Sequence, residues 1–216
     1  MLYDVSMPIY PGMPVYKNRP EKQPRFEVAR DYDRGLRETK ITLDAHTGTH
    51  IDAPLHISKS GRGVDGLDLQ GLIGPCRVLD LTHVDEKIEP AHLSEVDVQP
   101  GDFILFKTKN SWQEEFNFQF IYLTKEAAQY LAEKGVRGIG IDALGIERDQ
   151  PDYGTHGALL ERGVVIIEGL RLKEVNAGRY YLIAAPLPLV GVEAAPARVV
   201  LVKAADNNWF YPIRFH

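Results

Sequence analysis

The chain has 216 residues, a net charge of −5, and an ordinary balance of 44% hydrophobic and 25% charged residues. This length allows one sizeable buried core, and the composition is that of a soluble globular protein. The chain has no long basic run, which argues against a nucleic-acid partner. It also has no apolar stretch that approaches the roughly 20 residues needed to span a membrane. Cys76 is the only cysteine, which excludes an intramolecular disulfide, and no secretory signal is evident, so we expect a cytoplasmic protein.

The N-terminal quarter is predicted to form strands and loops. Residues 2–10 alternate in polarity and predict a first strand, and the proline-rich stretch that follows predicts a surface loop or flap. Tyr16 is an aromatic side chain in this loop, so it either pins the loop to the core or lines a site for an aromatic ligand or a dimer contact. Residues 24–32 and 36–44 predict a pair of strands joined by a turn.

The strongest chemical signal is the stretch of residues 44–56, D-A-H-T-G-T-H-I-D-A-P-L-H. It contains three of the chain's seven histidines, together with two aspartates. Imidazole and carboxylate are the usual protein ligands of zinc and similar divalent metals. A helix is disfavoured because Gly48 weakens it and Pro54 breaks it, so we expect a strand.

Side chains alternate faces along a strand, so His46, His50 and Asp52 are predicted to project from one face as metal ligands. Gly48 falls between the two histidines, where a missing side chain leaves room for an ion or a substrate. The proline that follows ends regular pairing, so His56 can turn back toward the ligands. The alternative is a half-buried strand whose histidines are only hydrogen-bonded.

The stretch H-T-G-T-H-I-D-A-P-L-H resembles the H-x-G-T-H-x-D-x-P-x-H signature of the cyclase-like metal-dependent hydrolases, and every fixed position is present. That family contains bacterial kynurenine formamidase and isatin hydrolase. The resemblance implies one α/β domain over residues 1–216, with a swivelling β/β/α arrangement around a mixed β-sheet core. It also implies that the N-terminal loop borders the active site and that His56 is the general acid/base. A free histidine pKa of about 6.5 suits proton transfer at neutral pH.

The middle of the chain is predicted to alternate strands with helices. Strands are expected at 74–82, 102–108 and 138–144. A helix is expected at 124–134, with Thr124 as its N-cap and a glycine directly after it. A helix that leads into a buried strand is an α/β unit, which agrees with the implied fold class.

Three side chains of this region have alternative interpretations. Trp112 opens an aromatic, irregular segment, and it either contacts an aromatic substrate or packs in the core or in a dimer interface. Asp142 ends a strand and either orients a metal-ligating histidine or is structural. Cys76 is expected to be core filler because no activating neighbour is evident.

A second chemical constellation lies in residues 155–168. Asp152 and Thr155 are expected to cap a short helix that His156 opens, and Glu168 ends a buried apolar strand. A carboxylate there is costly to bury unpaired, so it needs either a metal or an ion pair with an arginine such as Arg171. The spacing matches the further His and Glu ligands of a two-metal centre in the family, so the resemblance favours the metal.

These features predict a metal-dependent hydrolase of an amide-type bond. The predicted ligands would hold one or two zinc ions, with manganese as the alternative. Asp52 is the better bridging candidate because a carboxylate has two oxygens to share. The best-known reaction of the family is the arylformamidase step of tryptophan catabolism, in which N-formyl-L-kynurenine is cleaved to L-kynurenine and formate.

Other functions use different features of the chain. Isatin-type ring opening, or cleavage of another cyclic or N-acyl amide, would use the same centre. A metal-stabilised binding protein without turnover is disfavoured, because a non-ligand histidine beside the cluster argues for chemistry. A serine hydrolase is disfavoured because the chain has no G-x-S-x-G motif.

The expected partners are a small aromatic amide and, as the resemblance implies, further copies of the chain in a homodimer or larger assembly. The aromatic loops and the aromatic tail of residues 209–216 offer surface for such contacts. Neither a nucleic acid nor a membrane is expected as a partner.

Overall fold

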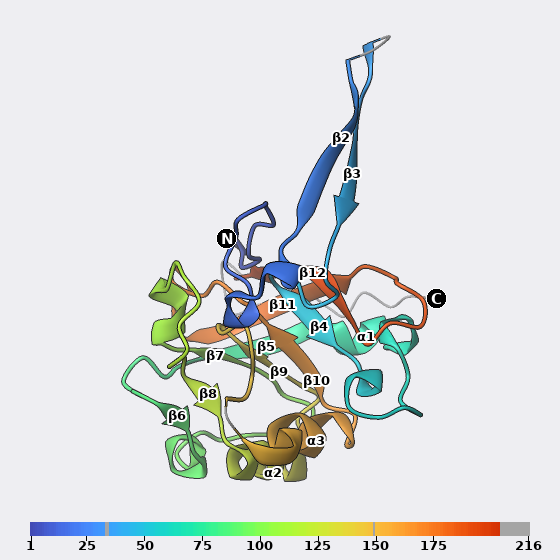
Figure 1. The fold of residues 1–216 in the computed structure, drawn as a ribbon. Helices are drawn as coiled ribbons and strands as arrows, with labels where there is room; N and C mark the ends of the chain where they lie inside the picture. The colour runs from blue at the N-terminus through green and yellow to red at the C-terminus, as the bar shows by residue number, and fades with distance from the viewer. Residues whose placement is uncertain (33–34, 149, 204–216) are drawn as a thin grey trace.

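A closed, mixed β-sheet forms the centre of the molecule (Figure 1). The computed structural model describes residues 1–32, 35–148 and 150–203, so the aromatic tail lies outside the described residues. The strands of the sheet are β1 (Leu2–Asp4), β4 (His50–Asp52), β5 (Ile73–Asp80), β7 (Phe103–Lys107), β9 (Gly138–Ile141), β10 (Val165–Glu168), β11 (Gly178–Pro186) and β12 (Ala194–Val202). The α/β class and the mixed sheet predicted from the sequence are confirmed.

The sheet closes into a barrel because β4 pairs on both sides. The strand order is β1-β12-β11-β5-β7-β9-β10-β4, and β4 also pairs with β12. The four consecutive strands β5, β7, β9 and β10 run parallel to one another. The pairs β10–β4, β11–β12 and β11–β5 are antiparallel. Closure leaves the short strand β1 as an addition along β12.

Side-chain alternation along β7 separates two apolar layers. Phe103 and Leu105 point into the barrel, whereas Ile104 and Phe106 point outward. Each of these side chains is fully buried, which contributes about 1.5–3 kcal/mol per residue. The outer layer is covered by the helices α2 (Lys125–Glu133) and α3 (Gly154–Leu160), as Figure 1 shows. The outer face of this part of the barrel wall is therefore covered by helices.

Helix α2 follows its sequence signals. Thr124 is the N-cap, and its hydroxyl accepts a hydrogen bond from Ala127 N at 3.2 Å. Gly135 follows the helix with φ +76°, which is the left-handed conformation that favours glycine. The remaining helix, α1 (Leu69–Leu72), is one turn long. In the described part of the chain, no helix is long and apolar enough to cross a membrane.

The predicted pair of strands before the histidine motif forms an arm. Strands β2 (Arg25–Asp31) and β3 (Arg37–Thr42) pair only with each other and project away from the barrel (Figure 1). Phe26 pairs with Ile41, and Val28 on the same face pairs with Thr39. One face of the arm is thus apolar and exposed in the single chain. Two short parallel strands, β6 (Lys87–Ile88) and β8 (Tyr122–Leu123), form a separate pair.

The strand expected through residues 44–52 is wrong except for its last three residues, which form β4. The Asp44 carboxylate accepts a hydrogen bond from His46 N at 2.9 Å, and its carbonyl accepts one from Thr47 Oγ1 at 2.7 Å, so the chain turns. Gly48 has φ +63°, and a Cβ there would face Ile9 and Met13 at 3.4 Å. Gly48 therefore permits the turn and does not leave room for an ion.

One further element is shorter than expected. The strand predicted over residues 2–10 ends at Asp4, and Met7 N donates to the Thr49 hydroxyl at 2.7 Å instead of to a neighbouring strand. A 3₁₀ turn, Pro90–Leu93, follows β6 (Lys87–Ile88).

Candidate metal centre

Strand β4 presents two candidate ligands on the outer face of the barrel. His50 and Asp52 share this face because Ile51, between them, packs into the barrel interior. Antiparallel pairing sets Glu168 of β10 directly opposite His50. All three polar side chains are buried. A strand pair thus brings together residues that are far apart in the sequence.

The five ligands predicted from the sequence gather in one cluster around Asp52. Asp52 Oδ1 lies 3.1 Å from His46 Nδ1 and 3.6 Å from His50 Nε2. Asp52 Oδ2 lies 3.6 Å from His156 Nε2. The Glu168 carboxylate closes the cluster, 3.3 Å from His50 Nε2 and 3.4 Å from His156 Nε2. Three imidazoles and two carboxylates therefore converge in a buried space.

Four buried polar atoms of this cluster have no hydrogen-bond partner among the described residues: His50 Nε2, both carboxylate oxygens of Asp52, and His156 Nδ1. His50 Nδ1 lies 2.9 Å from Gly48 O, so a neutral His50 carries its proton on Nδ1 and turns the Nε2 lone pair toward the carboxylates. Unsatisfied buried groups cost about 1–3 kcal/mol each. A divalent cation would satisfy His50 Nε2 and the two Asp52 oxygens, so the residues fit a metal.

The ligand atoms form two compact groups that share one residue. His46, Asp52 and His56 make one group, and His50, Asp52 and Glu168 make the other, with the ligand atoms of each within 4.8 Å of one another. Asp52 belongs to both groups, as expected of a bridging carboxylate.

Charges inside the cluster strongly perturb its protonation. Burial alone lowers the pKa of His50, but the Glu168 and Asp52 carboxylates outweigh it and raise that pKa to about 9. Burial and the Asp52 charge disfavour ionised Glu168, yet the neighbouring His156 and His50 imidazoles lower its pKa to about 2. Without a cation, His50 is therefore protonated at neutral pH. A metal must displace that proton, so metal affinity is expected to rise with pH.

His56 turns back over the cluster, as its proline-containing sequence suggested. It ends the 3₁₀ turn Pro54–His56, and its ring centroid lies 4.5 Å from that of His46 and 5.2 Å from that of His156. Burial is the main cause that lowers the pKa of His56 below its usual 6.5. Its imidazole is therefore neutral at pH 7 and able to accept a proton.

Helix α3 is capped differently from the expectation for Asp152 and Thr155. Tyr153 precedes the helix with φ 49° and gives no side-chain cap. Instead, the Glu147 carboxylate accepts hydrogen bonds from Thr155 N at 2.7 Å and His156 N at 3.2 Å. Glu147 Oε2 also lies 3.4 Å from His156 Nδ1. Glu147 therefore caps the helix start and lies beside the His156 imidazole, a position in which carboxylates are common behind metal-ligating histidines.

Two carboxylates of the site had no recognised sequence signal. Glu147 lies in the irregular segment between β9 and α3, and nothing in its local pattern separates it from a surface residue. Glu193 precedes β12, and its Oε1 lies 3.6 Å from His46 Nε2. Each glutamate follows a glycine by two residues, Gly145 and Gly191, and this weak indication of a loop is the one local signal that could have singled them out.

The alternatives that involved Asp142 and Arg171 resolve differently. The Asp142 carboxylate accepts hydrogen bonds from the backbone and hydroxyl of Thr108, both at 2.7 Å, and from those of Ser111 at 3.1 and 2.6 Å. It therefore holds the loop after β7. Arg171 makes no ion pair with Glu168 in the described residues, so that alternative is wrong; Glu168 instead accepts a hydrogen bond from Ile146 N at 2.6 Å.

A cavity of about 550 Å³ opens over the cluster. Tyr16 and Tyr153 line it together with His56, and the Tyr16 ring packs edge-to-face on Phe116 with centroids 5.4 Å apart. Trp112 does not line it; the Lys107 ammonium lies 5.3 Å from the centroid of its ring. Trp112 therefore has no place in the substrate site proposed below, whereas Tyr16 does.

The barrel and its buried cluster of imidazoles and carboxylates define a metal-dependent hydrolase. Residues 3–148 match the family described as "Putative cyclase", and the chain belongs to that family. It is 36% identical to a kynurenine formamidase of Salinibacter ruber over 209 residues, which cover 95% of this chain and 99% of that relative.

Two solved structures extend the comparison. A "predicted metal-dependent hydrolase" from Bacillus stearothermophilus is 54% identical, with a TM-score of 0.87 and coverage of 93% of this chain and 97% of that one. Isatin hydrolase A from Labrenzia aggregata is 27% identical, with a TM-score of 0.81 and coverage of 94% and 93%. The cyclase-like resemblance of the histidine motif is thereby confirmed.

Proposed function

We propose that the protein is an arylformamidase that cleaves N-formyl-L-kynurenine to L-kynurenine and formate, a step of tryptophan catabolism. The observation that carries this proposal is a buried ligand cluster with orphaned polar atoms under an aromatic-lined cavity, with a neutral histidine beside it. The cavity volume lies within the range of small-molecule sites. The relative from Salinibacter ruber, named a kynurenine formamidase, supports the choice of substrate.

The proposed mechanism divides the work between a cation and the chain. A divalent cation at this site would lower the pKa of water from about 16 toward about 7 and would polarise the formyl carbonyl. His46, His50, Asp52, His156 and Glu168 are the residues that would hold it. This ligand set is mostly imidazole, which suits zinc, while its carboxylates also admit manganese. Because Asp52 belongs to both ligand groups, it would help to hold each ion if two are bound.

His56 moves the proton. In this proposal its neutral imidazole accepts a proton from the attacking water and returns it to the aniline nitrogen as the C–N bond breaks. The oxygen of water joins the formyl carbon, so the products are formate and the aryl amine. Tyr16 and Tyr153 at the cavity wall orient the aryl ring.

The direct test is formate release from N-formyl-L-kynurenine, measured with and without a chelator, together with metal analysis of the purified protein. We expect turnover that the chelator abolishes and that added zinc or manganese restores, because the orphaned cluster needs a cation. Metal-bound protein that releases no formate from this substrate would contradict the arylformamidase assignment. Chelator-resistant turnover would contradict the metal mechanism.

Isatin-type ring opening is the second candidate function. The specific observation in its favour is the fold-wide similarity to isatin hydrolase A, at 27% identity and a TM-score of 0.81. Both reactions cleave an amide carried by an aromatic ring, so the same cluster serves either. Parallel assays of N-formyl-L-kynurenine and isatin separate them by the ratio of kcat/KM.

We also propose a homodimer held by the arm of β2 and β3. A lone two-stranded hairpin is marginally stable in water. The apolar face of this arm is exposed in the single chain: Phe26 by 39%, Val28 by 50% and Ile41 by 55%. In a two-fold dimer each arm can lie on the partner's surface, so both apolar faces are covered by one contact.

Charging the apolar face of the arm is expected to convert the dimer to a monomer. Val28→Lys combined with Ile41→Lys places two cations where apolar contact is required, and the cost of burying unpaired charge opposes association. Light scattering after size exclusion measures the mass. Glu27→Gln on the opposite face is the matched control and should stay dimeric. A monomeric wild type at micromolar concentration, or an unchanged double variant, would refute this interface.

A reducing, cytoplasmic location is proposed from the cysteine content. Cys76 is the only cysteine and is buried in β5, where burial raises the pKa of its thiol to about 12. Such a thiol is inert core filler. Fractionation of the source cells tests the location.

A further inference from the structure

The mouth of the cavity carries three cations on one short loop. Lys17, Arg19 and Lys22 all line the cavity and come from the 3₁₀ turns Tyr16–Asn18 and Pro20–Lys22 and the residue between them. Lys22 has a partner, since its Nζ lies 3.0 and 3.1 Å from the two Asp44 carboxylate oxygens.

The other two cations have no acidic partner. Within the described residues, neither Lys17 nor Arg19 has a carboxylate within 4.0 Å. Lys17 Nζ lies 5.3 Å from the centroid of the Tyr16 ring, so it sits beside the aromatic wall of the cavity. The Arg19 guanidinium makes no hydrogen bond to any described residue. The cavity rim therefore offers positive charge that the protein itself does not neutralise.

The acidic groups of the cavity are already engaged by their own partners. Glu147 is bound by the first backbone N–H groups of α3, Asp44 by Lys22, and Glu193 faces the His46 imidazole. These carboxylates therefore do not neutralise Lys17 or Arg19. A ligand that spans the cavity meets a cation cluster at one end and the metal ligands at the other.

The backbone holds the cationic loop in a sparsely populated conformation. Lys17 has φ 56° and Asn18 has φ 51°, both in the left-handed region that favours glycine. Such residues cost energy and gather at ligand-binding sites. The loop is secured by Asn18 N, which donates to Val15 O at 2.9 Å, and by the Gln23 side-chain amide, which donates to Met13 O at 2.9 Å. The backbone that carries Lys17 and Arg19 is therefore fixed beside the cavity.

We propose that Arg19, assisted by Lys17, binds a carboxylate of the substrate at the end remote from the scissile amide. This inference rests on the proposed function and narrows its substrate class to aromatic amides with an anionic tail. The planar guanidinium fork matches a carboxylate with two parallel hydrogen bonds. N-formyl-L-kynurenine has this chemistry, with its formamide on one side of the ring and its amino-acid carboxylate on the other. Isatin carries no carboxylate.

The test compares two formamides that differ in the amino-acid group, which carries the carboxylate together with the α-ammonium. Arg19→Gln should raise KM for N-formyl-L-kynurenine about 10- to 100-fold, the range of a lost charge-assisted hydrogen bond, with kcat little changed. KM for N-(2-acetylphenyl)formamide, which has the same aryl formamide and no carboxylate, should not change. Arg19→Lys should recover part of the loss, and Lys17→Gln should give a smaller effect of the same kind.

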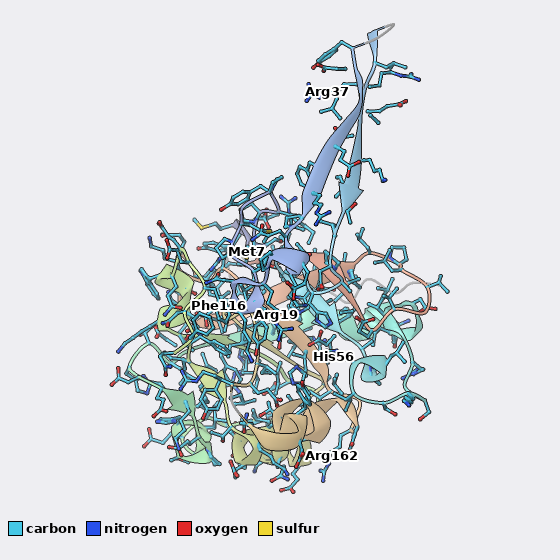
Figure 2. The ribbon with its side chains drawn as sticks, in the orientation of Figure 1. Met7, Arg19, Arg37, His56, Phe116 and Arg162 are labelled. Carbon is cyan, nitrogen blue, oxygen red and sulfur yellow. The ribbon has the colours of Figure 1, made fainter. Side chains whose placement is uncertain are left out.

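Arg162→Gln is the matched control. Arg162 follows α3, and Figure 2 shows it at the bottom of the view, below Arg19. It should leave both KM values unchanged. An equal rise in KM for both formamides, or no rise for either, in Arg19→Gln would overturn the carboxylate subsite.

Failure of the proposed function gives a different result. If the wild type cleaves neither formamide, the arylformamidase assignment fails, and the subsite is judged by calorimetric binding of L-kynurenine. Wild-type binding that Arg19→Gln weakens at least tenfold supports the subsite. Binding of equal strength in the two proteins, or no binding to the wild type, overturns it.

Discussion

Asp52→Asn is expected to remove most of the bound metal and to reduce amide hydrolysis by a factor of about 10³ or more. Asp52 is the one residue shared by both groups of ligand atoms, and its two oxygens face His46, His50 and His156. An amide of the same shape lacks the charge and one of the two acceptor oxygens. A loss of metal assistance is worth several kcal/mol of barrier, and each 1.36 kcal/mol is a factor of ten in rate.

The prediction becomes specific when the metal content of Asp52→Asn is compared with that of a variant expected to lose only part of the metal. His46→Ala removes a ligand from one group only, so it should retain about half of the wild-type metal, whereas Asp52→Asn should lose both ions. Circular dichroism and thermal unfolding must show a folded chain in each case. Metal content in Asp52→Asn equal to that of the wild type would exclude Asp52 as the shared ligand. Equal losses in the two variants would indicate a single ion.

Some elements of this protein are visible in the sequence because their signals are local. Helix α2 has Thr124 before it and Gly135 after it, and the structure uses both. The buried strand β10 ends at Glu168, as its apolar run predicted. The five predicted ligands could be recognised because a histidine-rich motif and a buried carboxylate at a strand end have few uses other than metal binding. In the structure these five side chains lie together.

The errors arise where distant contacts decide the local backbone. The turn at His46 depends on a close approach of two loops: Thr49 Oγ1 donates to Gly169 O at 2.6 Å. A Cβ at Gly169 would come within 2.4 Å of Gly48 O, so only glycine allows this contact. No pattern within residues 44–56 contains that information, so alternation alone suggested a longer strand. The pairing of β4 with both β10 and β12, which closes the barrel, is equally non-local.

Glu147 was not predicted for the same reason. Its carboxylate matters because α3 starts beside it, and that contact depends on how the segment after β9 folds over the outer face of the barrel. In the sequence it is one acidic residue among many. Motif reasoning finds residues that touch a metal more readily than residues that orient them.

His56→Gln is expected to lower kcat by a factor of about 10² to 10⁴ while the metal content stays at the wild-type level. That range is the usual contribution of a positioned general acid or base. The neutral imidazole of His56 is the proposed proton carrier, and burial keeps its pKa below 6.5, so it is ready to accept a proton at pH 7. Glutamine retains hydrogen-bonding capacity but transfers no proton. KM should change less than kcat, because His56 acts on the reacting atoms.

The same experiment decides between two roles that the geometry allows for His56. Its ring lies close enough to His46 and Asp52 to serve as a metal ligand as well as a base. Loss of one ion per chain in His56→Gln would assign it as a ligand, and full activity would remove it from the mechanism. His83→Gln, a change at an exposed histidine, is the matched control and should alter neither rate nor metal content. A wild-type metal content together with a much lower kcat in His56→Gln would assign proton transfer to His56, because the loss of a metal ligand would lower the metal content as well.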